Sequence, residues 1–386
     1  MPTKPVPVSK KLLYYSIMIV VLLMIIELCS RAYYYQGLSP HPIASIQVLK
    51  DFRKLVRKKF LPDSATKRLL NNHYLIRPEL PRAENDRINT ETALANQAVY
   101  EPWVEFAFRD IQSKYVNVKD HIRRSVPERS DSLSTDSLTV FFLGGSTMYG
   151  FNVTDAETIP ACFVKAYQKK YPHGTPIHVV NYGTPSYFSY QELILLVDRI
   201  LHDQKPDMVV MLDGLNDCLQ ARSSYAREPL YKPGFGEFIN PGGDNDRTQF
   251  ADFYELPAGM KADSACTLIY QRYIDNIRHA REIAGFYGIS LYCFWQPVPY
   301  YNYPNRVNDP ICTKSSPERF GYIYPLVKNK ARELDYLFFL GDMLEREKGL
   351  PFIDQIHYSP DFNRAVAENI LQVMSFKPRP QLFIRK

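Results

Sequence analysis

Short apolar runs alternate with amphipathic segments from residue 138 to residue 375. The runs are continuous and rich in Val, Ile, Leu and Phe, as is typical of strands buried in a parallel sheet, and between them apolar residues recur with helical spacing. Such alternation predicts an α/β fold of three layers, α/β/α, in which helices cover both faces of a parallel sheet. The pattern predicts strands at 138–143, 177–181, 207–213, 289–295 and 336–340, and helices at 157–171, 189–203, 267–286, 318–334 and 361–375.

The amino-terminal segment differs from this pattern, because residues 12–30 form an almost unbroken apolar run. About 18 such residues are just enough to span a bilayer. Lys10 and Lys11 precede the run, so the positive-inside rule places residues 1–11 in the cytoplasm and the main domain outside it, in the periplasm or at the cell surface. A cleaved signal peptide is the alternative, but the end of the run lacks a clean small-x-small cleavage site. The segment therefore predicts one transmembrane helix that anchors the protein in the cell membrane.

The juxtamembrane region, residues 31–99, has no pattern that assigns a fold. Within it, residues 50–68 contain eight Lys or Arg and two acidic residues, interleaved with apolar ones. This composition is typical of a solvated amphipathic helix or of a helix that lies on anionic lipid, and it competes with the amino-terminal charges in setting the topology. The main domain is expected to cover 100–376, with a Pro-, Gly- and Tyr-rich insertion at 219–263 and a tail at 377–386.

Composition and charge exclude several classes of function. The chain has 386 residues and a net charge of +6, with no Lys/Arg-rich stripe near the motifs described below, which argues against nucleic acid as a partner. Its six cysteines and eight histidines show no metal-ligand spacing, so no metal or other cofactor is predicted. Cys293 is expected to be a buried thiol. Cys218, Cys266 and Cys312 are expected in loops, and a disulfide among them is open to more than one pairing.

Two short motifs follow predicted strands. Residues 144–147 (Gly-Gly-Ser-Thr) follow the first strand, and residues 214–217 (Gly-Leu-Asn-Asp) follow the third. The carboxyl ends of parallel strands meet at one edge of a sheet, which is where ligands bind in open α/β folds. Ser146 and Asn216 are therefore expected to lie together at that edge.

A third motif, residues 354–357 (Asp-Gln-Ile-His), precedes the last predicted helix. Within one turn the Asp354 carboxylate can accept the Nδ1 proton of His357, which leaves Nε2 as a general base. The candidate residues also have ordinary structural interpretations. Gly183, which follows the second predicted strand, could form a tight turn, Asn216 could cap a helix, and His357 could be the partner of a buried carboxylate. The joint order and the placement at strand ends favour a Ser-His-Asp catalytic triad.

With these motifs and with residues 181–183 (Asn-Tyr-Gly), the segment from 138 to 374 resembles the SGNH/GDSL hydrolases, in particular their membrane-anchored bacterial members. The resemblance implies a five-stranded parallel sheet in flavodoxin-like order. It also implies that Ser146 is the nucleophile, that His357 and Asp354 complete the triad, and that an oxyanion hole is formed by the N–H groups of Ser146 and Gly183 and the side chain of Asn216. The first motif departs from the Gly-Asp-Ser-Leu of the family name, because Gly145 precedes the serine.

The predicted function is that of a membrane-anchored serine esterase, which removes O-acyl groups, O-acetyl foremost, from a cell-surface or exported glycan through an acyl-enzyme, or cleaves a small ester. Two alternatives remain: an O-acyltransferase with the same triad, and a non-catalytic glycan-binding or assembly protein on the same fold. The insertion at 219–263 leaves the same edge as Asn216 and is expected to wall the substrate site. Gln296 and Thr147 are candidate substrate contacts.

Overall fold

The computed structural model describes residues 80–126, 137–202, 204–219, 262–304 and 318–376. All of them belong to one compact unit, Leu69–Lys386, and a separate unit, Met1–Arg68, lies outside the described residues. The predicted anchor at 12–30, the basic segment at 50–68, almost all of the insertion and the tail at 377–386 lie outside them as well. Within the described ranges, no helix is both long enough and apolar enough to cross a membrane.

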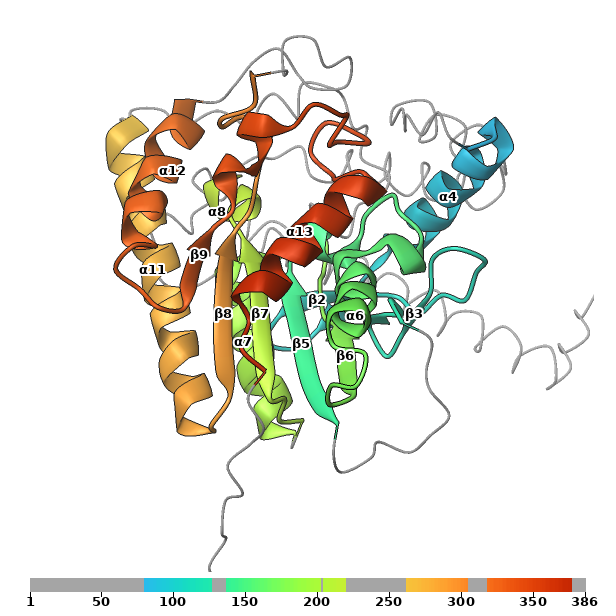
Figure 1. The fold of residues 1–386 in the computed structure, drawn as a ribbon, viewed down its shortest axis with the longest axis horizontal. Helices are drawn as coiled ribbons and strands as arrows, with labels where there is room; N and C mark the ends of the chain where they lie inside the picture. Colours follow the sequence, from blue (N-terminus) through green and yellow to red (C-terminus); the bar gives the residue numbers. More distant parts are fainter. Residues whose placement is uncertain (1–79, 127–136, 203, 220–261, 305–317, 377–386) are drawn as a thin grey trace, which may run out of the picture. The chain divides into compact units, whose positions relative to one another are not determined.

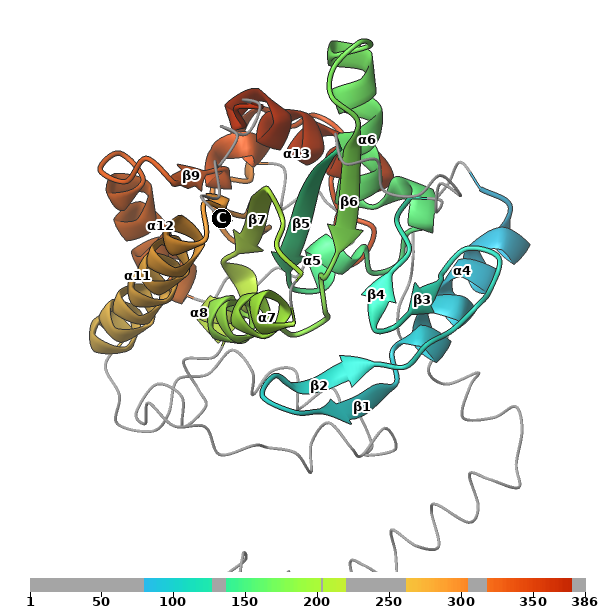
Figure 2. The same cartoon turned by 90° about the horizontal axis from the view of Figure 1, so that it is seen from below.

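The centre of the described unit is one mixed sheet with the strand order β3-β4-β6-β5-β7-β8-β9 (Figures 1 and 2). The five strands from β6 to β9 are parallel and follow the flavodoxin-like order expected from the sequence. Two short antiparallel strands beyond β6 extend the sheet and were not predicted, because two residues are too few to show an alternating pattern. The strands are β3 (Val118–Lys119), β4 (Ile122–Arg123), β5 (Leu138–Gly144), β6 (Ile177–Asn181), β7 (Met208–Asp213), β8 (Ser290–Trp295) and β9 (Leu337–Phe339).

Helices cover both faces of the sheet, as the alternation predicted (Figure 2). On β5, Val140 and Phe142 belong to the core beneath α6 and α13, whereas Phe141 and Leu143 belong to the core beneath α7, α11 and α12. Successive residues of a strand point to opposite faces, so a continuous apolar run serves both cores. The predicted helices are confirmed within a few residues as α6 (Ile159–Lys170), α7 (Ser189–Leu201), α11 (Ala262–Phe286), α12 (Glu318–Lys330) and α13 (Pro360–Val373).

Further short elements join or flank these layers. The helices α5 (Ser146–Tyr149) and α8 (Leu215–Leu219) begin directly after β5 and β7, and η1 (Asp155–Glu157) and η5 (Gly341–Arg346) are 3₁₀ turns. The helix α4 (Arg82–Ala95) and the hairpin of β1 (Ala98–Glu101) and β2 (Glu105–Phe108) precede the sheet.

The hairpin β1–β2 packs on the start of α7. The Tyr187 hydroxyl donates a hydrogen bond to the carbonyl of Phe106, and the Gln191 side chain donates one to the carbonyl of Val104 at 3.4 Å. The α4 helix is tied to the main unit through Glu91, whose carboxylate accepts the N–H of Tyr115 at 2.6 Å. The helix α4 and the hairpin β1–β2 therefore contact the part of the chain that carries the motifs. Residues 82–99 of these elements were expected in the juxtamembrane region, 31–99, rather than in the main domain.

The cysteines differ in part from the prediction. Cys293 is a buried thiol in β8, as expected. Cys218 and Cys266 lie in the helices α8 and α11 rather than in loops, because α8 follows Gly214 at once and α11 begins earlier than its periodicity indicated. Cys218 is a free, buried thiol, so the structure contains no disulfide to it, and Cys312 lies outside the described residues.

Candidate active site

The tight turn after β5 presents Ser146 at the carboxyl edge of the sheet. Gly145 is the N-cap of α5 and Ser146 its first residue. A Cβ atom on Gly145 would lie 2.3 Å from Nδ2 of Asn216 and 3.0 Å from the carbonyl oxygen of Tyr187. The first contact would force the Asn216 amide to move, and the second is tighter than an ordinary contact, so the position before the serine favours glycine here. This close approach confirms that Ser146 and Asn216 lie together.

His357 reaches Ser146 from the loop before α13. Its Nε2 lies 2.8 Å from Oγ of Ser146, and its Nδ1 lies 2.7 Å from Oδ2 of Asp354. The loop is closed by the hydrogen bond from the Ile353 N–H to the His357 carbonyl at 2.9 Å, and Ser359 caps the helix that follows. The structure therefore brings the three predicted triad residues together in a continuous hydrogen-bonded chain.

The Asp354 carboxylate is held by four hydrogen bonds. Its Oδ1 accepts the N–H groups of Ile356 at 3.0 Å and His357 at 2.8 Å, and its Oδ2 accepts Nδ1–H of His357 and Nδ2–H of Asn152 at 2.7 Å. Burial raises the pKa of the Asp354 carboxyl, but the charge of His357 and the hydrogen bonds outweigh it and lower this pKa to about 2. Ionised Asp354 keeps the proton of His357 on Nδ1, which leaves Nε2 to act as the base.

Two residues after α5, Phe151 and Asn152, support the triad and were not predicted. Asn152 is buried and left-handed, with φ 65°, and its side chain spans to Asp354. The Phe151 ring stacks on the His357 imidazole, with 4.6 Å between centroids. The available sequence signal was Gly150 followed by Asn152, since both residue types tolerate the left-handed backbone that turns the chain toward His357.

The predicted oxyanion donors differ in their surroundings. The Ser146 N–H opens α5, where it has no partner within the helix. Asn216 donates one Nδ2–H to the Tyr187 carbonyl at 2.7 Å and keeps its second N–H beside Gly145. Their part in an oxyanion hole stays a prediction, and both groups lie at the turn that carries Ser146.

Gly183, the third predicted donor, already has an acceptor for its N–H in this structure. That N–H donates to Oδ1 of Asn181 at 2.9 Å. The position requires glycine for another reason: a Cβ there would lie 2.4 Å from the N atom of Tyr149. Gly183 therefore lets the loop after β6 pack closely against the backbone of α5.

Ser186, later in the same loop, is a further candidate donor. It has a left-handed backbone with φ 71°, and its N–H finds no acceptor among the residues that the structure describes. It directly precedes Tyr187, whose carbonyl accepts the hydrogen bond from Asn216.

The two candidate substrate contacts are buried instead. Thr147 and Gln296 are each 4% exposed. Gln296 packs under the turn before Asn216, where its Cγ would lie 3.3 Å from a Cβ on Gly214. Both residues therefore pack within the site, and their contact with a substrate stays a prediction, because Ser146 and His357 are also buried, at 8% and 9% exposed.

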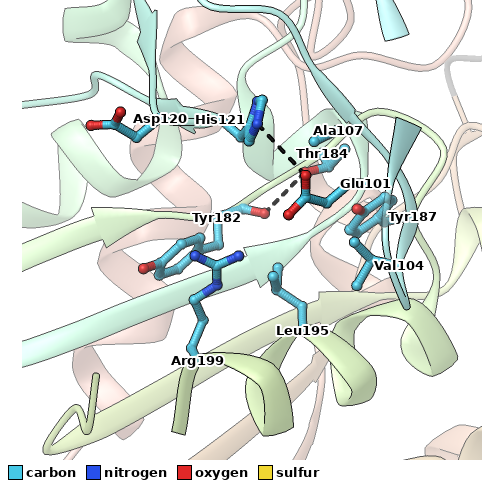
Figure 3. A pocket seen from close by; sticks show the side chains of 10 residues that line it. All are labelled: Glu101, Val104, Ala107, Asp120, His121, Tyr182, Thr184, Tyr187, Leu195 and Arg199. Atoms are coloured by element: carbon cyan, nitrogen blue, oxygen red, sulfur yellow. Dashed lines mark hydrogen bonds and ion pairs between the residues drawn. The ribbon is translucent and has the colours of Figure 1, made fainter. Parts of the chain in front are cut away.

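A small cavity of ≈ 20 Å³ lies beside the loop between β6 and α7 (Figure 3). Thr184 and Tyr187 line it from the loop, Arg199 from α7, and an ion pair of His121 with Glu101, 3.7 Å apart, closes another side. This volume holds about one water molecule. The cavity is thus too small for a substrate, and none of the triad residues lines it. In the described ranges, no cluster of three or more His, Cys, Asp or Glu is placed to hold a metal ion.

No family model and no curated protein matches this sequence. Similar solved structures include a protein assigned to the G-D-S-L lipolytic family from Desulfitobacterium hafniense, with 16% identity over 61% of this chain and 99% of that chain and a TM-score of 0.38. A variant of Axe2, an acetyl-xylooligosaccharide esterase from Geobacillus, has 18% identity over 63% of this chain and 97% of its own, with a TM-score of 0.36. The acetyl xylan esterase AlAXEase has 12% identity over 62% and 100%, with a TM-score of 0.36. All three scores are low, so none of these proteins identifies the activity of this chain.

Proposed function

We propose that this chain is a serine esterase that works through an acyl-enzyme on Ser146. The observation that carries the proposal is the chain of hydrogen bonds from Ser146 Oγ to His357 Nε2, 2.8 Å, and from His357 Nδ1 to Asp354, 2.7 Å. A serine hydroxyl is a weak nucleophile unless an adjacent base takes its proton. Here the base is held in the required tautomer by a carboxylate that stays ionised down to about pH 2.

The reaction has two halves. In the first, Ser146 gives its hydroxyl proton to Nε2 of His357 while Oγ bonds to the ester carbonyl carbon. The resulting tetrahedral oxyanion collapses, the bond to the leaving alcohol breaks, and His357 returns the proton to that alcohol. In the second half, water gives a proton to His357 and its oxygen bonds to the acyl carbon. The bond from that carbon to Oγ then breaks, His357 returns the proton to Oγ of Ser146, and the carboxylic acid leaves.

The negative oxygen of each tetrahedral intermediate needs donors in fixed positions. We assign the Ser146 N–H and an Nδ2–H of Asn216 to this role. Asn216 supports the assignment because its hydrogen bond to Tyr187 and its contact with Gly145 fix the amide before a substrate arrives.

We further propose that the substrate is an O-acylated glycan, with O-acetyl groups foremost, outside the cytoplasm. The support is the apolar run at 12–30, which would hold the domain at the membrane, and the insertion at 219–263, which leaves the catalytic edge of the sheet. Membrane lipid around the anchor and the acylated glycan are then the partners of this protein.

The test is hydrolysis of p-nitrophenyl acetate by the full-length protein in detergent, compared with Ser146→Ala and His357→Ala. Each variant should lose turnover by at least about a thousandfold, because triad residues act as one unit. The matched controls are Ser290→Ala and His202→Ala, which alter exposed residues away from the site. Equal activity of wild type and Ser146→Ala would rule the proposal out.

The same assay addresses the acyltransferase alternative. A hydrolase releases free acetate into water, so release should not depend on a sugar acceptor. Product formation that requires an added glycan acceptor, with the same loss in Ser146→Ala, would instead identify an O-acyltransferase.

A further inference from the structure

Three carboxyl groups are buried under the turn that carries Asn216. Glu192 on α7, Asp213 at the end of β7 and Asp217 on α8 are 0%, 3% and 6% exposed. Asp217 is well satisfied, because it accepts the Ser189 hydroxyl at 2.6 Å and the Gly214 N–H at 3.3 Å. In contrast, all four carboxyl oxygens of Glu192 and Asp213 are buried and accept no hydrogen bond from any other residue that the structure describes.

Two unpaired carboxylates cannot stay ionised in such a place, because each charge would lose its hydration without gaining a partner. Burial, together with the charge of Asp213 and its hydrogen bond, raises the pKa of Glu192 well above its usual value. Burial and the charge of Asp217 likewise raise the pKa of Asp213. The other titratable and charged groups around the pair are Asp217 from α8, Tyr273 and Arg281 from α11, and Cys293 from β8.

Burial also raises the pKa values of Tyr273 and Cys293, so neither becomes a charge near neutral pH. Burial also raises the pKa of Asp217, although the hydrogen bonds from Ser189 and Gly214 oppose this effect. The pair therefore has one acidic neighbour, Asp217, two neutral ones, and one positive group, Arg281, which acts on Cys293. A carboxylic acid facing a carboxylate is the arrangement that satisfies both groups with one proton.

We propose that Glu192 is a positioning residue that keeps its proton at neutral pH, donates it to Asp213, and thereby holds the β7–α8 turn that presents Asn216 to Ser146. The catalytic part of this inference rests on the function proposed above. The shared proton itself does not.

Covalent bonds and packing contacts connect the Glu192–Asp213 pair to Asn216. Asp213 is bonded to Gly214, and Gly214 packs against the Trp295 ring, since a Cβ at this glycine would lie 3.2 Å from that ring. On the other side, the turn is tied to the start of α7 by Asn216 on the Tyr187 carbonyl and by Asp217 on Ser189. A second negative charge between Glu192 and Asp213 would push β7 and α7 apart at the place where these ties meet.

The proton has a measurable effect on stability with a definite sign. A carboxyl whose pKa is raised by folding binds a proton that the unfolded chain has already released. The stabilisation that this proton contributes is complete below the ordinary pKa of Glu, about 4.3, and decreases as the pH rises toward the pKa in the folded protein. For one proton, the folding equilibrium constant falls by up to about tenfold per pH unit. Glu192→Gln keeps a donor toward Asp213 and cannot titrate, so it should lose this dependence.

The experiment compares full-length wild type, Glu192→Gln and Glu282→Gln by denaturant unfolding at about pH 6 and about pH 9. Glu282 is an exposed residue of α11, so its variant controls for the loss of one carboxylate. We expect the ratio of folding constants, Glu192→Gln over wild type, to rise by at least tenfold between the two pH values, and the Glu282→Gln ratio to stay level. If Glu192→Gln does not fold, Asp213→Asn places the amide on the opposite partner and permits the same comparison.

The positioning role is read from the rate at which a fluorophosphonate probe labels Ser146 at the same pH values. Glu192→Gln should keep a larger share of its near-neutral rate at about pH 9 than wild type does. Equal pH dependence of stability in both proteins would overturn the shared proton. If the pH dependence of stability changes but that of labelling does not, the positioning role is overturned. If the wild type is never labelled, the proposed function is refuted, and the unfolding measurements still test the shared proton.

Discussion

The hydrogen bond from Asn152 to Asp354 offers the sharpest test of how the triad is held. Asn152→Ala removes the 2.7 Å bond to Oδ2 and leaves that oxygen with His357 as its one partner among the described residues. Hydrogen bonds to charged groups contribute about 1.5–3 kcal/mol. When Ser146 loses its proton, His357 becomes positive and needs Asp354 in position, so most of this energy should appear in the transition state. A loss of that size is about 10- to 150-fold in kcat.

The assay is p-nitrophenyl acetate hydrolysis with kcat and KM measured separately. We expect kcat to fall within that range while KM changes less, because Asn152 is buried behind Asp354 and does not face a substrate. Asn302→Ala is the matched control, since Asn302 is also left-handed, with φ 45°, and also donates to a carboxylate, Asp342, at 2.8 Å. A kcat within twofold of wild type for Asn152→Ala, or an equal loss for Asn302→Ala, would refute the reasoning.

Three further outcomes are expected. Asn216→Ala should lower kcat by about 100- to 1,000-fold at unchanged stability, the usual loss for an oxyanion donor, and a loss seen only in KM would count against that role. The pKa of Asp354 is lowered to about 2, so its contribution to stability is present above the ordinary value near 3.8 and is lost as pH falls toward 2. Asp354→Asn should therefore cost about 2 kcal/mol in unfolding free energy at neutral pH, and the difference from wild type should shrink between about pH 4 and about pH 2, whereas a constant difference would contradict the assignment. Gly183→Ala should destabilise the protein by about 1–3 kcal/mol in thermal unfolding because its Cβ would lie 2.4 Å from the N atom of Tyr149, whereas Gly285→Ala, with open space around it, should cost nothing comparable.

Several features were open to prediction because they depend on local order in the chain. The five parallel strands are continuous apolar runs that must be buried on both faces, and the helices between them have a clear apolar face. The turn from residue 354 to 357 is local as well, so the pairing of His357 with Asp354 followed from spacing alone.

Other features could not be read from a local pattern. The strands β3 and β4 have two residues each, so they show no alternation. Gly183 matched its motif, but a motif does not say which acceptor an N–H will meet, and Asn181 takes it. The burial of Glu192 beside Asp213 likewise appears only when α7 is packed on the sheet, since a helical Glu is ordinarily solvent-exposed.

The sequence by itself determined the five parallel strands, the layers and the edge at which Ser146, Asn216 and His357 meet, because hydrophobic periodicity and strand direction are properties of short segments. The tertiary structure decided which atoms touch: Asn152 with Asp354 across 202 residues, and Ser146 with His357 across 211. Hydrogen bonds between such distant residues require an accuracy of a few tenths of an ångström, and only the packing of the whole unit sets positions that finely.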